Sequence, residues 1–173
     1  LEKIVKIINN VIRDNGIIYV AGNGGSHNIA NHLYVDFFKG ISNQTNLYPK
    51  VISLSSEGSL LTAVGNDIDF SEIFSFQLNH RITNKDVFIA ISSSGKSPNI
   101  IKAIKMANDF KAETILFCGF EGGEAKLYAK HSLHFPFKNY GVVEDLSQII
   151  MHVISQYIRM KNLRNISVED AIF

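Results

Sequence analysis

Short runs of consecutive apolar residues alternate along the chain with longer segments in which apolar residues recur every three or four positions. The short runs have the length of buried strands and lie at residues 17–21, 51–54, 87–92, 114–118 and 132–135. The longer segments have the period of amphipathic helices and lie near residues 4–12, 26–40, 57–64, 70–80, 97–110 and 123–130 and from residue 143 onward. Alternating strands and helices predict an α/β fold, in which a five-stranded parallel sheet is wound with helices on both faces. Ligands then belong at the carboxyl ends of the strands.

Two turns rich in glycine and hydroxyl groups lie at such strand ends. Residues 22–26 read Gly-Asn-Gly-Gly-Ser, and residues 91–99 read Ile-Ser-Ser-Ser-Gly-Lys-Ser-Pro-Asn. Each turn precedes a helical segment, so backbone N–H groups, serine hydroxyls and the positive end of a helix dipole favour an anion such as phosphate. The alternative is an ordinary turn with Ser97 as N-cap and Pro98 at the first helical position. Neither turn has the glycine spacing of the dinucleotide fingerprint or of the nucleotide P-loop.

Four ionisable side chains form two pairs at helical spacing. His32 and Asp36 are four residues apart and share a helix face, which suits the chelation of one metal ion. Glu144 and His152 are eight residues apart, about two turns of an otherwise apolar helix. The alternatives are a surface pair for the first two, a helix-dipole charge for Glu144 and a hydrogen-bonded core position for His152. Spacing alone leaves both interpretations open.

Composition narrows the class of protein. The chain has 173 residues, of which 46% are hydrophobic, enough for one core and one domain. Lys and Arg number 17 against 16 Asp and Glu with no basic block, so a nucleic-acid partner is not expected. No apolar run approaches the ~20 residues that span a bilayer, so no membrane partner is expected either. Cys118 is the only cysteine, which excludes an internal disulfide and fits a reducing cytoplasm.

Residues 22–27, His32, residues 65–67, residues 91–99 and the helix entered through residues 143–145 resemble, in this order, the sugar isomerase (SIS) domain family. Within that family the chain looks most like bacterial phosphoheptose isomerases, over nearly its whole length. The resemblance implies one domain over residues 1–173 that lacks an N-terminal helix found in relatives. It implies an aldose–ketose isomerase that interconverts sedoheptulose 7-phosphate and D-glycero-D-manno-heptose 7-phosphate through an enediol or enediolate, for lipopolysaccharide or capsule precursors.

The resemblance also implies a zinc site and its ligands. The two family histidines fall at His32 and His152, the catalytic glutamate at Asp36 and the usual glutamine at Glu144, so that Asp36 and His152 are the candidate base and acid. A further family histidine is replaced by Ser147. Two acidic ligands would leave a divalent cation formally neutral and a weaker Lewis acid. The side chain of Asp36 is also one methylene shorter than glutamate for proton transfer.

The substrate contacts that the resemblance implies come from the two turns and from two acidic positions. They are Asn23, Ser26, Asp67, Ser92, Ser93, Ser94, Ser97 and Glu144. Ser93 replaces a threonine of the family, and the alternative for Asp67 is a turn that ends a helix. The altered positions keep a second hypothesis open, namely a non-catalytic sugar-phosphate sensor or partner-binding regulator.

The aromatic residues Tyr34, Phe37 and Phe38 crowd one short helix, and the terminal helices carry more apolar residues than one sheet face needs. Apolar surface of this kind on a monomer favours self-association. The sequence therefore predicts a homo-oligomer, and the family resemblance implies a tetramer.

Overall fold

The computed structural model describes residues 1–172 and is built on one five-stranded sheet in the order β2-β1-β3-β4-β5. All four neighbouring pairs are parallel, with Val20 of β1 beside Ile89 of β3 in the centre. The strands are β1 (Ile17–Gly22), β2 (Lys50–Ser53), β3 (Val87–Ile91), β4 (Glu113–Cys118) and β5 (His131–His134). The predicted parallel sheet is confirmed, and each predicted strand end lies within one residue of the observed one.

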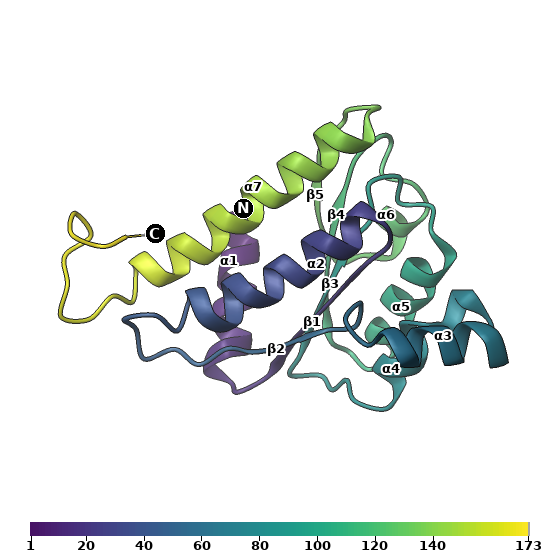
Figure 1. Ribbon diagram of the computed structural model, residues 1–173, viewed down its shortest axis with the longest axis horizontal. Coiled ribbons are helices and arrows are strands. Elements are labelled where there is room, and N and C mark those ends of the chain that lie inside the picture. The colour runs from purple at the N-terminus through teal and green to yellow at the C-terminus, as the bar shows by residue number, and fades with distance from the viewer. Residues whose placement is uncertain (173) are drawn as a thin grey trace.

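Helices cover both faces of the sheet (Figure 1). One face carries α1 (Glu2–Arg13), α2 (Gly25–Val35) and α7 (Tyr140–Met160), and the other carries α3 (Gly58–Asp67), α4 (Ser75–Asn79), α5 (Pro98–Asp109) and α6 (Ala125–Tyr128). Along β1, Ile18 and Val20 pack into the first layer, whereas Tyr19 and Ala21 pack into the second. Because successive side chains point to opposite faces and both faces are buried, the strands are continuous apolar runs.

Two predicted helices are interrupted. The segment predicted over residues 26–40 is α-helical only to Val35 and continues as a π-turn, η1 (Asp36–Gly40), in which the Ile41 N–H donates to the Asp36 carbonyl at 3.0 Å. The segment predicted over residues 70–80 divides into a 3-10 turn, η2 (Phe70–Glu72), and α4. The Ser75 hydroxyl donates to the Glu72 carbonyl at 3.2 Å at this division. No helix within residues 1–172 is long and apolar enough to cross a membrane.

Two buried groups in the sheet ionise with difficulty. Burial raises the pKa of the Cys118 thiol to about 11. Burial, with a smaller contribution from the Asp86 carboxylate, raises the pKa of Tyr19 to about 12. The Tyr19 hydroxyl has no hydrogen-bond partner among the described residues.

The order of the strands decides where a ligand site can form. The second strand, β2, lies on one side of β1, and β3, β4 and β5 follow on the other side. The connections that leave β1 and β3 therefore run in opposite directions along the sheet, and a crevice forms between them beyond the carboxyl ends of these two strands. Both hydroxyl-rich turns lie at this position. The helix that follows the first turn, α2, lies beside α7, and both run in the same direction away from the crevice (Figure 1).

Candidate active site

A cavity of about 310 Å³ lies between the two hydroxyl-rich turns. Five predicted phosphate-binding hydroxyls line it, those of Ser26, Ser92, Ser93, Ser94 and Ser97. Only Ser94 has a protein partner among residues 1–172, since its hydroxyl accepts from the Lys96 N–H at 3.3 Å. Hydroxyl donors that face an open cavity at the start of α2 and α5 favour an anion. We refer to this cavity as the serine cradle.

The backbone of the cradle requires glycine at two positions. Gly24 and Gly95 have φ angles of 56° and 64°, which side chains rarely adopt. At Gly95 an added Cβ would also collide with the carbonyl of Gly122. These positions hold the two turns in a shape that keeps the cavity open.

Asn23 connects the two turns. Its side-chain amide pairs reciprocally with that of Asn99, at 2.8 and 3.0 Å, so the first turn is bound to the start of α5. Asn99 is buried and had no role assigned from the sequence. A role for Asn99 could have been expected from its position directly after Pro98, at the beginning of a predicted helix. That position lies at the carboxyl end of a strand, as Asn23 does, so the two amides could be expected to meet.

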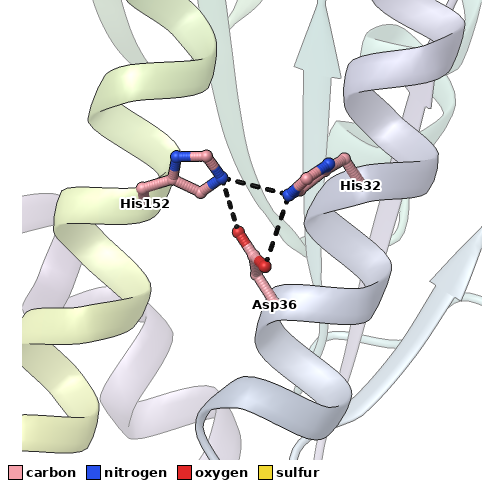
Figure 2. A group of neighbouring side chains, drawn as sticks. All are labelled: His32, Asp36 and His152. Carbon is pink, nitrogen blue, oxygen red and sulfur yellow. Dashed lines mark hydrogen bonds and ion pairs between the residues drawn. The ribbon is translucent and has the colours of Figure 1, made fainter. Parts of the chain in front are cut away.

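The side chains of His32, Asp36 and His152 converge between α2 and α7 (Figure 2). The two Nε2 atoms are 3.1 Å apart, and the Asp36 oxygens lie 3.5 Å from His32 Nε2 and 3.1 Å from His152 Nε2. The nearer oxygen, Oδ2, is buried and accepts no hydrogen bond of good geometry from the described residues. Two imidazole nitrogens and a carboxylate aimed at one point form a donor set that suits zinc. The residues present therefore fit a metal ion.

This group is accessible from outside the protein. The side chains of His32 and His152 are 47% and 37% exposed, against 22% for Asp36. Asp36 is the first residue of the π-turn, and the next residue, Phe37, is buried in the core. A substrate can therefore reach the imidazoles and the carboxylate while the chain beside them is anchored.

Glu144 lies away from that group. A Cβ added to Gly25 would collide with the Glu144 carboxylate, so Glu144 sits over the start of α2, on the wall of the serine cradle. It is eight residues from His152, about 12 Å along the helix. Among residues 1–172 the group of His, Cys, Asp and Glu side chains that could hold a metal consists of His32, Asp36 and His152. Ser147 is buried and donates to the Val143 carbonyl at 2.7 Å, within its own helix.

The remaining predicted residue, Asp67, lies outside the cradle. It is the last residue of α3, and its Oδ1 accepts from Asn66 Nδ2 at 2.8 Å. A larger cavity of about 990 Å³ adjoins the cradle through the shared residues Asn23, Gly24 and Ser97, and His27, Asn66 and Phe70 are among its other lining residues. This cavity could not be predicted from the sequence, because its walls come from four segments that are separate along the chain.

Comparisons with known proteins agree with this fold. The SIS domain family matches residues 1–119 and, in a second description of the domain, residues 68–172. A phosphoheptose isomerase of Helicobacter pylori (strain P12) is 30% identical over 161 residues, which cover 89% of this chain and 80% of that protein. Solved phosphoheptose isomerases from Neisseria gonorrhoeae and Francisella tularensis superpose with TM-scores of 0.84 and 0.85, each at 27% identity over 91% of this chain and 84% of theirs. These relatives are phosphoheptose isomerases, and the chain belongs to the SIS domain family.

Proposed function

We propose that this aldose–ketose isomerase interconverts sedoheptulose 7-phosphate and D-glycero-D-manno-heptose 7-phosphate. The observation that carries the proposal is that Glu144, on the wall of the serine cradle, and His152, in the group with His32 and Asp36, are eight residues apart on α7, which is about 12 Å along the helix axis. At about 1.2 Å per bond, an extended seven-carbon chain spans about 10 Å from phosphorus to C1. A phosphate held in the cradle thus brings C1 and C2 of a heptose to the group, whereas a triose phosphate would fall several ångströms short.

The reaction moves a proton between adjacent carbons, and two side chains are placed for it. The carboxylate of Asp36 is the base that removes the proton from the carbon beside the carbonyl and returns it to the neighbouring carbon. The second is His152, whose Nε2 lies 3.1 Å from that carboxylate. His152 is the candidate acid, and it exchanges a proton with the substrate oxygen, as the enediol or enediolate forms and collapses, from an imidazole nitrogen that binds no ion, because a coordinated nitrogen carries no proton and no free lone pair. Each such transfer contributes about 10²–10⁴-fold when donor and acceptor are within hydrogen-bond reach.

We further propose that the group holds Zn²⁺, with His32, Asp36 and His152 as ligands. The buried Asp36 oxygen without a hydrogen bond and the close approach of the two Nε2 atoms support this assignment. When bound, the ion supplies Lewis-acid polarisation of the substrate carbonyl and hydroxyl oxygens. The serine hydroxyls and the two helix N-termini bind the phosphate of the substrate.

The proposed assembly is a homotetramer in the cytoplasm, where the product feeds heptose units of surface polysaccharide. On α7 the side chains of Ile149, Val153 and Tyr157 are 54%, 43% and 44% exposed, and on the neighbouring segment Tyr34 and Phe38 stack with ring centres 5.5 Å apart. A second copy of the chain would bury this apolar surface. Light scattering at micromolar concentration tests the assembly, and a monomeric mass would refute it.

The function is tested by incubating the purified, zinc-loaded protein with sedoheptulose 7-phosphate and following the aldose product by chromatography. Turnover that His152→Ala abolishes, while phosphate affinity is retained, supports the isomerase. The second candidate, a sugar-phosphate sensor, is favoured by the short carboxylate at Asp36 and by Ser147, which stands where family isomerases have a histidine. A protein that binds zinc and heptose phosphate but gives no product with any phosphorylated ketose would establish the sensor.

A further inference from the structure

The backbone that carries Asn23, in the first hydroxyl-rich turn, is fixed by the sheet and by one buried serine. The preceding residue, Gly22, pairs with Ile91 of the neighbouring strand β3. The Ser55 hydroxyl accepts from the Gly22 N–H at 3.1 Å and donates to the Gly22 carbonyl at 3.0 Å. These contacts set the position of Asn23 and leave only the orientation of its side-chain amide to be determined.

The hydrogen bonds of Asn99 determine that orientation. A side-chain amide can lie in two ways that differ by the exchange of its oxygen and its nitrogen. The Ile100 N–H donates to Asn99 Oδ1 at 2.9 Å, and the reversed amide would bring the Asn99 NH2 group against that donor. Asn99 Oδ1 consequently accepts from Asn23 Nδ2 at 2.8 Å, and Asn99 Nδ2 donates to Asn23 Oδ1 at 3.0 Å. A reversed Asn23 would oppose donor to donor and acceptor to acceptor at both contacts.

This orientation leaves one N–H of Asn23 for a ligand. An amide NH2 group has two donors, and Asn99 accepts one of them. The other has no acceptor among residues 1–172, and Asn23 lines both the serine cradle and the larger cavity beside it. Asn99 is buried and lines only the larger cavity. Any influence of Asn99 on the cradle therefore passes through Asn23.

From this arrangement we infer that Asn99 is a positioning residue for phosphate binding, which holds the Asn23 amide so that an N–H, and not the carbonyl oxygen, faces an anion in the serine cradle. The inference rests on the phosphate site proposed above. The orientation matters because the Glu144 carboxylate already lies on the wall of the cradle, and an amide oxygen turned towards the anion would add to that repulsion. An N–H at the same place adds a charge-assisted hydrogen bond to those of the serine hydroxyls.

Titration of the full chain with inorganic phosphate tests the inference, because this ligand needs the cradle and no sugar contacts. Asn23→Ala, Asn99→Ala and the double variant are compared by calorimetry. We expect each single variant to lose about 5–50-fold in phosphate affinity, since an amide that is absent or free to turn no longer holds its donor towards the anion. The double variant should stay within about twofold of Asn23→Ala, because Asn99 acts only through Asn23. With sedoheptulose 7-phosphate, Asn99→Ala should raise KM by more than it lowers kcat, as expected for a contact to the non-reacting phosphate.

Asn108→Ala is the matched control. It removes another side-chain amide from α5, nine residues after Asn99, whose Nδ2 donates to the Tyr128 carbonyl at 2.8 Å. This variant should lower the free energy of unfolding in urea and keep phosphate affinity within about twofold of the parent. If Asn99→Ala does not fold, Asn99→Ser takes its place in the comparison, because the serine hydroxyl is too short to hold both bonds to Asn23.

Three results would overturn the inference: unchanged phosphate affinity in the Asn99 variant, losses that multiply in the double variant, or an equal loss in Asn108→Ala. A parent protein that binds phosphate and gives any of these results refutes the role of Asn99 and leaves the isomerase in place. A parent that binds no phosphate refutes the serine cradle itself.

Discussion

Glu144 places a negative charge on the wall of a cavity that is proposed to hold phosphate, and Glu144→Gln tests the consequence. A sphere of about 310 Å³ has a radius of about 4 Å, so a phosphate at its centre would lie about 5–6 Å from the charge of that carboxylate. At an effective dielectric constant near 20, two like unit charges at that distance repel by about 3 kcal/mol. Glu144 is half-buried, and water screens part of this repulsion. We therefore expect the amide to strengthen phosphate binding by about 1–3 kcal/mol, or about 5–150-fold.

The assay is calorimetric titration with inorganic phosphate and with sedoheptulose 7-phosphate, at low and at high salt. Asp145→Asn is the matched control, because it removes the same charge from the next residue, which is exposed and does not line the cradle. A gain for both ligands that shrinks at high salt is the expected result. A gain for phosphate with a loss for the sugar phosphate would mean that Glu144 also binds sugar hydroxyls. Unchanged or weaker phosphate binding would refute the placement of the anion in the serine cradle.

Other predictions address the remaining parts of the site and the core. Ser94→Ala should weaken sugar-phosphate binding by about 1.5–3 kcal/mol in the same titration, through loss of a charge-assisted hydrogen bond, and an unchanged affinity would remove Ser94 from the cradle. Asp36→Glu should raise initial isomerisation rates by up to about 100-fold if the short carboxylate limits proton transfer, whereas no product from either form favours the sensor. Tyr19→Phe should raise the free energy of unfolding in urea by about 1 kcal/mol, because the buried hydroxyl lacks a partner, and a comparable decrease would show that it has one. The pKa of Cys118 is about 11 and that of Tyr19 about 12, above their usual values of 9.0 and 10.0, so both groups stay neutral to higher pH in the folded protein than in the unfolded chain. Their contribution to the free energy of unfolding is therefore fully present below about pH 9. Unfolding free energies should consequently fall between about pH 9 and 12, less so in Tyr19→Phe, and a flat profile would contradict the burial of both groups.

The sheet was predictable because its strands are buried on both faces, which turns each into a continuous apolar run that stands out from the periodic helices. The serine cradle was predictable for a related reason, since parallel strands bring their carboxyl ends to one edge and the two turns could only meet there. The π-turn was not predictable, because residues 36–40 contain no proline and end in a glycine that also terminates ordinary helices. The eight-residue spacing correctly placed Glu144 and His152 on one helix. Spacing along a helix gives no measure of how far the two side chains reach, so their binding of one metal ion stays a prediction.

The π-turn at Asp36 also determines how this part of the gene can vary in length. Asp36 must face α7, whereas Phe37 and Ile41 must face the core, and the hydrogen bond from Ile41 back to Asp36 spans one residue more than an α-helix allows. Deleting one residue between them would let the Ile41 N–H donate to the same Asp36 carbonyl at α-helical spacing, so Ile41 would stay one turn after Asp36 and keep its place in the core. Phe38 and Lys39 are exposed, so replacing either side chain disturbs little of the core. This turn is therefore a point at which the chain can lose one solvent-facing residue while Asp36 still faces α7 and Ile41 still faces the core.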